Sequence, residues 1–355
     1  MLLNNAASIS CSPRVQMIVN GQIVAGVMDA EVTSNNYYSA DRFNASVALG
    51  LDPWATPAFW SNENDILVEL QFSLDDGASF TSLVQGAVDC VTIDPTLGLA
   101  HLTGRDLTAP LIETRTQETF ANHTSSEIAT LLAGRHNLTP QVTPTTTPVG
   151  RYYQNEHDSV TLDQFSRATT EWDLLVFLAR WEGFDVFVAG SALYFQPTAD
   201  PADTSFTFSP ADVIDLKLER SLILAGGLSV VVKSWNSRQN SAFVQQAQGN
   251  SANSSGSTQN YVYVRPNLTP DAALKFANQK LTELTRHERT IEVRMPGELT
   301  LNARSTITLE GTGTEFDQAY YVDLIERRVT YRSGMTQFIR AKNASPGATT
   351  GVGGS

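Results

Sequence analysis

Cysteine is nearly absent from this sequence of 355 residues, which contains only Cys11 and Cys90. Two thiols this far apart in the chain provide neither the paired CxxC spacing of a zinc site nor a dense disulfide framework. We therefore expect two buried or idle thiols, and the sequence does not indicate whether they meet.

Positive charge is also scarce. The chain has 24 Lys and Arg against 37 Asp and Glu, a formal net charge of -13. The lysines are Lys217, Lys233, Lys275, Lys280 and Lys342. Without a basic run, the chain is not expected to hold nucleic acid by neutralising phosphates. A negative passage could still surround DNA without binding it.

Long apolar runs are missing as well. No stretch of 18 apolar residues exists, and Met1–Ser12 lacks the charged and apolar regions of a secretory signal. We expect a soluble chain made in a cytoplasm. With 41% apolar residues, a chain of this length should form two to four compact domains.

Recognisable catalytic patterns are lacking too. The five histidines are scattered without an HExxH motif, and no G-x-S-x-G elbow presents a serine. The Gly311-Thr312-Gly313 stretch lacks the lysine and the helix of a phosphate-binding loop, so we expect it to form a turn. The sequence predicts no enzyme, no catalytic residue, no cofactor and no metal site.

Short alternating strands separated by turns dominate the first third of the chain. Asn20-Gly21 and Asp75-Asp76-Gly77 have the composition of hairpin turns, which favours an antiparallel barrel or sandwich.

An aromatic loop between Leu49 and Asn64 interrupts these strands. It contains the candidate partner-binding residues Trp54, Phe59 and Trp60. Exposed aromatic side chains can anchor a partner, because they combine large apolar area with a polar group. The other interpretation is that the loop folds back and caps its own barrel.

The pattern then becomes helical. Thr124 to Glu127 is a capping box ahead of an apolar stripe, and Gly134 ends that helix. A second helix is predicted from Thr170 to Gly183, followed by a hairpin. We expect the Thr- and Pro-rich stretch 139–148 to be a stiff surface loop between them.

The last third returns to strands with one interruption. The polar stretch 237–259 has almost no large apolar residues, so we expect a mobile loop or a segment that orders only on assembly. Thr269-Pro270-Asp271 then begins a third helix, with an N-cap, a proline at the first helical position and an early acid.

Four stretches in this order resemble the late control protein D family. Members of this family are baseplate hub proteins of contractile-tailed bacteriophages, and they are similar to the N-terminal part of type VI secretion spike proteins. The resemblance covers about residues 14–341 and rests on LTGRDLTAPLIE (102–113), TEWDLLVFLARWEGFDVFVAGSALYF (170–195), DVIDLKLERSLILAGGLSVVVKSWN (212–236) and PGELTLNARSTITLEGTGTEFDQAYYVDLIERRVT (296–330).

The resemblance implies a fold of the α+β class that is mainly antiparallel β, with two tail-tube-like β-barrel domains. A small α+β domain would lie between them, and a helix-containing insertion would interrupt the second barrel. The implied ranges are 1–106 for the first barrel, 107–204 for the small domain, 205–238 and 290–342 for the second barrel, 239–289 for the insertion and 343–355 for a flexible tail.

The implied role is structural. A homotrimer would form a pseudo-hexameric ring that joins a sixfold tail tube to a threefold spike in the virion baseplate, after assembly in the host cytoplasm. Its implied partners are its own copies, a tail tube or tube-initiator ring, a central spike protein and baseplate wedge proteins. DNA would pass through the lumen without specific binding, and no membrane partner is expected.

Two rival interpretations stay open. One is a carbohydrate-binding or carbohydrate-cleaving tail component that uses the aromatic loop, although no lysozyme-like domain is recognisable. The other is a tail tube or tube-terminator subunit, although such proteins usually need one barrel and this chain is predicted to have two.

Overall fold

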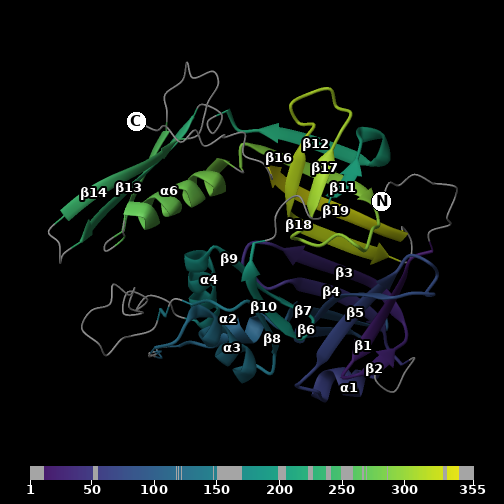
Figure 1. Ribbon diagram of the computed structural model, residues 1–355. Coiled ribbons are helices and arrows are strands. Elements are labelled where there is room, and N and C mark those ends of the chain that lie inside the picture. Colours follow the sequence, from purple (N-terminus) through teal and green to yellow (C-terminus); the bar gives the residue numbers. More distant parts are fainter. Residues whose placement is uncertain are drawn as a thin grey trace.

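The computed structural model describes residues 12–50, 55–116, 118, 120, 122–146, 148–149, 170–198, 205–222, 227–236, 241–248, 259–265, 268, 270–285, 287–330 and 334–343. It is mostly antiparallel β with five α-helices among these residues, in agreement with the predicted α+β class (Figure 1). No helix among the described residues is both long and apolar enough to span a membrane.

The strands are β1 (Arg14–Val19), β2 (Gln22–Val24), β3 (Val27–Asn35), β4 (Arg42–Ala48), β5 (Leu67–Ser73), β6 (Thr81–Asp94), β7 (Leu99–Asp106), β8 (Thr139–Val142), β9 (Phe184–Ala189), β10 (Ala192–Pro197), β11 (Ser205–Phe208), β12 (Asp215–Arg220), β13 (Leu228–Asn236), β14 (Ser241–Gln248), β15 (Gln259–Val264), β16 (Arg289–Pro296), β17 (Thr306–Leu309), β18 (Ala319–Thr330) and β19 (Gly334–Asn343). The helices are α1 (Pro57–Asn62), α2 (Ala109–Glu113), α3 (Ser125–Arg135), α4 (Glu171–Glu182) and α6 (Pro270–Thr285).

Thirteen strands form one continuous sheet. Its order is β12-β16-β19-β18-β3-β4-β7-β6-β5-β1-β2, with β17 also paired to β18 and β11 paired to β17. All these pairs are antiparallel except β11 with β17. The two closed barrels expected from the sequence are not confirmed, because the path among the described residues ends at β12 and at β2.

Each half of the sheet covers its own core. In the first half, alternating residues such as Met17 and Val19 of β1 point inward with no exposed surface. In the second half, Ile291 and Val293 of β16 do the same. The two-residue period of a strand with one buried face explains both patterns.

A helical unit packs beside the first half of the sheet (Figure 1). Helices α3 and α4 bury their apolar faces against each other and against β9 and β10. The predicted capping box is present, with Thr124 and Glu127 satisfying each other's backbone N–H groups. Helix α4 ends as predicted at Gly183, whose φ of 75° suits a residue without a Cβ.

The stretch predicted as a surface loop after α3 begins as a strand instead. Strand β8 pairs in parallel with β10, and the flanking backbone bonds run from Thr139 N to Ser191 O (2.8 Å) and from Thr143 N to Phe195 O (2.9 Å). The prediction for residues 139–142 is therefore wrong, because the exposed edge of β10 offers a ladder of backbone partners that outweighs local composition.

A separate three-stranded sheet, β14-β13-β15, packs on α6 away from the main sheet (Figure 1). Part of the polar stretch 237–259 is therefore a strand, contrary to expectation, since β14 pairs with β13 along its whole length. Residues 237–240 and 249–258 lie outside the described residues. Strand β13, assigned from the sequence to the second barrel, instead belongs with β14, β15 and α6.

The predicted hairpin turns are confirmed. Asn20 and Gly21 have φ values of 47° and 81°, and Asp76 and Gly77 have values of 60° and 87°. Asn, Asp and Gly favour these left-handed conformations, so the residue types at these positions predict the turns.

Gly104 provides a test of the packing between β4, β6 and β7. A Cβ at this position would lie 2.3 Å from the Ala87 carbonyl oxygen and 2.3 Å from the Phe43 ring. We expect Gly104→Ala to lower the free energy of unfolding by about 1–3 kcal/mol, as overpacking does. The measurement is chemical denaturation.

Gly134→Ala is the matched control. Nothing lies within 4 Å of a Cβ there, and the residue is in α3, so helix propensity should raise stability by about 0.5–1 kcal/mol. Equal effects of the two substitutions would contradict the close backbone approach at Gly104.

Candidate functional site

The two halves of the sheet are joined by a single strand that changes partner along its length. Residues 319–321 of β18 pair with β17, whereas Leu324 to Thr330 pair on the same side with β3. The second edge of β18 is paired with β19 throughout. In Figure 1, β18 and β3 lie next to each other where the two halves meet. We call this pairing the β3–β18 joint.

A bulge at Asp323 marks the change of partner. The register of β18 against β19 shifts between Val322 and Leu324, so Asp323 is the extra residue. Its carbonyl oxygen accepts a hydrogen bond from Asn36 N (2.8 Å), and its carboxylate accepts one from the Tyr37 hydroxyl (3.3 Å). Lys342 Nζ lies 2.8 Å from the same carboxylate. Burial and the nearby Asp323 raise the pKa of Tyr37.

The two cores meet at this joint. Tyr320, Val322 and Ile325 of β18 belong to the core of the second half, whereas Val329 belongs to the core of the first. One strand therefore contributes to both cores, so the halves cannot separate without exposing apolar surface.

Arg327 is buried at the centre of the joint, with 3% of its surface exposed. Its Nε donates to Glu298 O (2.9 Å) and to Gln337 Oε1 (3.1 Å), and its other donor group reaches Leu301 O. Burial lowers the pKa of the guanidinium to about 10. The side chain ties the 298–301 segment to the joint through a fork of donors that lysine cannot reproduce.

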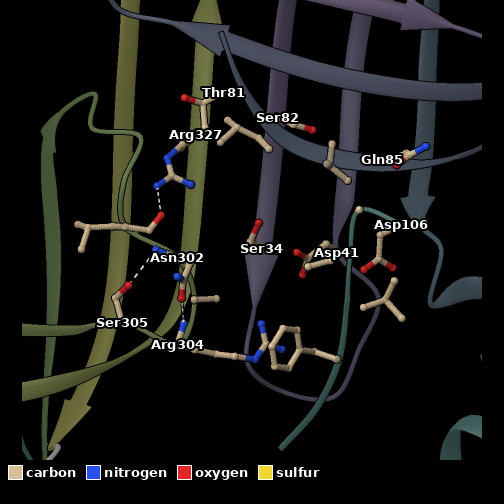
Figure 2. Close-up of a pocket in the computed structure, with 18 of the residues that line it drawn as sticks. Ser34, Asp41, Thr81, Ser82, Gln85, Asp106, Asn302, Arg304, Ser305 and Arg327 are labelled. Atoms are coloured by element: carbon tan, nitrogen blue, oxygen red, sulfur yellow. Dashed lines mark hydrogen bonds between the residues drawn. The ribbon is translucent and has the colours of Figure 1, made fainter. Parts of the chain in front are cut away.

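A cavity of about 420 Å³ lies beside Arg327. Its walls come from the start of β6, the β9–β10 hairpin, the segment 299–305 and the turn between β3 and β4. Figure 2 shows Asp41 and Asp106 close together on one side, with Arg304 and Arg327 on the segments facing them. The cavity is thus where the first half, the helical unit and the second half of the sheet meet.

Burial sets the ionisation of this cavity. The pKa of Asp106 is raised to about 7, mainly by burial and secondly by the neighbouring Asp41. Burial also raises the pKa of Asp41. Burial lowers the pKa of Arg304, against the opposing effect of Asp41 and Asp185, and its guanidinium lies 3.8 Å from the centre of the Phe187 ring.

Among the described residues no group of three or more His, Cys, Asp or Glu side chains is placed to hold a metal ion. One histidine, His136, lies 2.5 Å from Glu171, which Arg135 also contacts at 3.1 Å, and this cluster links α3 to α4. The geometry of the site is suited to holding segments together.

The comparisons with known proteins identify the fold of this chain. No protein-family model matches the sequence, and no curated protein is significantly similar to it. The 43 kDa tail protein of prophage MuSo2 from Shewanella oneidensis superposes with a TM-score of 0.68 at 14% identity, over 94% of this chain and 99% of that one. A tail protein from Neisseria meningitidis MC58 gives 0.67 at 14% identity, over 95% and 99%.

The chain has the fold of phage tail proteins. A component of the type VI secretion system, the E. coli c3393 protein, is also similar, with a TM-score of 0.55 at 9% identity over 92% of this chain and 76% of that one. These neighbours bear out the resemblance drawn from four sequence stretches.

Within this tail-protein fold, Trp60 of the aromatic loop is less exposed than a partner anchor requires. Trp60 is 3% exposed and belongs to the core of the first half, and Phe59 packs against it edge-on with ring centres 4.9 Å apart. Trp54 lies outside the described residues. The burial of Trp60 favours the capping interpretation, so partner binding by this loop remains a prediction for Trp54 and Phe59.

The position of one of the two cysteines, Cys90, can be compared with the expectation from the sequence. Cys90 is free and exposed on β6, so it is not one of the buried thiols that the sequence left possible. Cys11 lies outside the described residues.

Sequence reasoning missed Asp323 and Arg327. A signal was present, since Ile325, Arg327 and Val329 alternate and place an arginine in an inward-facing position of a strand. A charged residue in that register indicates a buried, multiply bonded side chain.

Replacing Arg327 tests the joint. Arg327→Met would leave two backbone carbonyls and Gln337 without their donor, so we expect a loss of about 2–4 kcal/mol in the free energy of unfolding. We expect the stability of Arg327→Lys to lie between that of Arg327→Met and that of the unsubstituted protein. The neighbouring Arg328→Met is the control, because that side chain is 59% exposed and its pair with Glu31 is long, at 3.8 Å. Similar losses at both positions would contradict the role of Arg327.

The raised pKa of Asp106 predicts that the stability of the fold depends on pH. Because its folded-state pKa lies above the unfolded value, its contribution favours folding at low pH and is lost as pH rises towards and past 7. Asp106→Asn removes this titration, so its stability relative to the unsubstituted protein should improve by about 2 kcal/mol between pH 5 and pH 8.

The control for this experiment is Asp317→Asn. Hydrogen bonds from Thr312 lower the pKa of exposed Asp317, so its effect on stability changes only at acidic pH. Thermal denaturation at several pH values distinguishes the two variants, and parallel pH profiles would refute the assignment to Asp106.

Proposed function

We propose that this chain is a structural subunit of a phage tail baseplate hub. In this role three copies form a ring of six similar sheet halves around the path of the DNA, between a sixfold tail tube and a threefold spike. The observation that carries the proposal is the β3–β18 joint, which fixes two sheet halves side by side in one chain.

The chemistry of the site supports this role. The buried groups at the joint serve to hold segments in place, and the fold is that of phage tail proteins. A structural subunit that holds its neighbours in a fixed arrangement needs rigid connections between its own parts more than it needs a reactive group.

The face of the sheet opposite the cores is compatible with a passage for DNA. It alternates acidic and basic side chains, such as Glu292 with Arg340 (2.8 Å) and Glu31 with Arg328. Charges that pair in this way give no strong attraction for phosphates.

The proposed partners are further copies of this chain, a tail tube or tube-initiator ring, a central spike and baseplate wedge proteins. The proposed location is the virion baseplate after assembly in the host cytoplasm. A carbohydrate-binding role is less well supported, because Trp60 is buried and two aromatic residues make a weak platform.

The experiment is the solution mass by light scattering after size exclusion over a range of protein concentrations. The proposal predicts a particle of three times 38.7 kDa at the upper concentrations. A particle that stays at the mass of one chain throughout would count against a self-assembling ring. Sugar binding that is lost with Phe59→Ala would then support the rival interpretation.

A further inference from the structure

The two halves of the main sheet repeat the same five-strand arrangement. The first half runs β3-β4-β7-β6-β5, the second runs β12-β16-β19-β18-β17, and every step in both is antiparallel. In each half the third and fourth strands of this order, β7 with β6 and β19 with β18, form a hairpin.

The repeat extends to a bulge and an ion pair. The register of β6 shifts between Val88 and Cys90, just as that of β18 shifts between Val322 and Leu324, and the extra residue is an aspartate in both. Asp89 pairs with Arg105 of β7 (2.6 Å), whereas Asp323 pairs with Lys342 of β19 (2.8 Å). The ladder partners of Val88 and Val322, Gly104 and Ala341, directly precede these two cations.

The equivalent edges differ in one respect. Beyond its bulge, β18 pairs with β3 in the joint. Beyond its own bulge, β6 from Cys90 to Asp94 pairs only with β7 among the described residues, and β12, the equivalent of β3, pairs only with β16. Among the described residues, each chain therefore has two strand edges that correspond to the joint but lack a partner. One is β12, which corresponds to β3, and the other is the part of β6 beyond Asp89, which corresponds to the part of β18 that pairs with β3.

We propose that β12 of one copy pairs antiparallel with the β6 segment beyond Asp89 of the next copy, which repeats the β3–β18 joint between chains. This inference rests on the proposed trimer and specifies the contact that closes it. Applying the register of the joint places Cys90 opposite Ser221, Thr92 opposite Glu219 and Asp94 opposite Lys217.

Charge supports this register. In the joint, Arg328 of β18 is opposite Glu31 of β3. At the equivalent position between copies, Asp94 would be opposite Lys217, which is the same pair with the signs exchanged. Opposite charges directly across two strands are favourable, whereas like charges are not.

Apolar exposure supports it as well. Leu218 of β12 is 37% exposed, yet it occupies the position at which Val32 of β3 is 1% exposed. The proposed register covers Leu218 and places it opposite Ile93, which packs on the first core. An unpaired edge strand with an exposed leucine is otherwise prone to unspecific pairing.

The native thiol makes a direct test possible. We would oxidise the full chain carrying Cys11→Ser and Ser221→Cys under mild conditions, and measure the mass of the same sample by light scattering. Cys90 and position 221 lie on directly opposed strand positions in the proposed pairing, within the reach of a disulfide. The expected result is a ladder of covalent dimer and trimer that disappears on reduction, with the linked peptides containing Cys90 and position 221.

The register control is Leu222→Cys in the same background. Leu222 is 74% exposed, and as the next residue along the chain it is displaced from the position opposite Cys90. A trimeric mass with linking at position 221 and little at 222 supports the inference. A trimeric mass with no linking, or with equal linking at both positions, overturns the proposed pairing and leaves the ring proposal standing. A single-chain mass with no linking at any concentration overturns both.

A charge substitution gives a second, independent readout. Lys217→Glu would face Asp94 of the next copy and should raise the concentration needed for half-assembly roughly two- to fivefold. Lys233→Glu makes the same charge change at an exposed position of β13, away from the proposed contact, and should leave assembly unchanged. Equal effects of the two variants would show that net charge, and not this pairing, governs assembly.

Discussion

The backbone pairing of β3 with β18 is the connection on which the arrangement of this protein depends. It converts two sheet halves, each with its own core, into one sheet of thirteen strands. Hydrogen bonds between strands are directional, so they fix the angle and the register between the halves as well as their proximity. The side chains around the joint reinforce it, since Val329 and Met335 from the C-terminal strands complete the core of the N-terminal half.

The polar groups near the joint show how a structural protein uses buried charge. Arg327 is placed where backbone carbonyls of an irregular segment would otherwise lack donors, and it satisfies two of them. Asp41 and Asp106 line the neighbouring cavity with carboxyl groups whose ionisation is suppressed by burial. Raised pKa values are often taken to mark catalysis, but here they accompany the meeting of three structural units.

Much of the fold could be predicted from the sequence because its signals are local. Capping at Thr124, termination at Gly183 and the turn at Asn20-Gly21 depend on residues within a few positions. The errors concern pairing over a distance. The composition of Ser241–Gln248 suggested a loop, but a neighbouring strand with free backbone groups made it a strand. The same holds for Trp60, because a tryptophan that closely follows two prolines can face solvent or its own core, and only tertiary packing decides which.

The joint itself could not be predicted, since nothing in the sequence of β3 specifies a partner almost three hundred residues later. Four short stretches did indicate the phage tail fold, and the structural neighbours agree. Those stretches carried information about element order, which a chain retains when its individual contacts have changed.

The bulge at Asp323 has a further consequence for how the chain can vary. Before it, the residues of β18 that reach the core are even-numbered, Tyr320 and Val322, and after it they are odd-numbered, Ile325, Arg327 and Val329. The extra residue thus shifts by one the numbering of the residues that face the core. Without this one residue Leu324 would follow Val322 directly, and Ile325, Arg327 and Val329 would still face the core. The cost of its loss would therefore fall on the contacts of Asp323 with Asn36, Tyr37 and Lys342, while the facing of the rest of β18 would be kept.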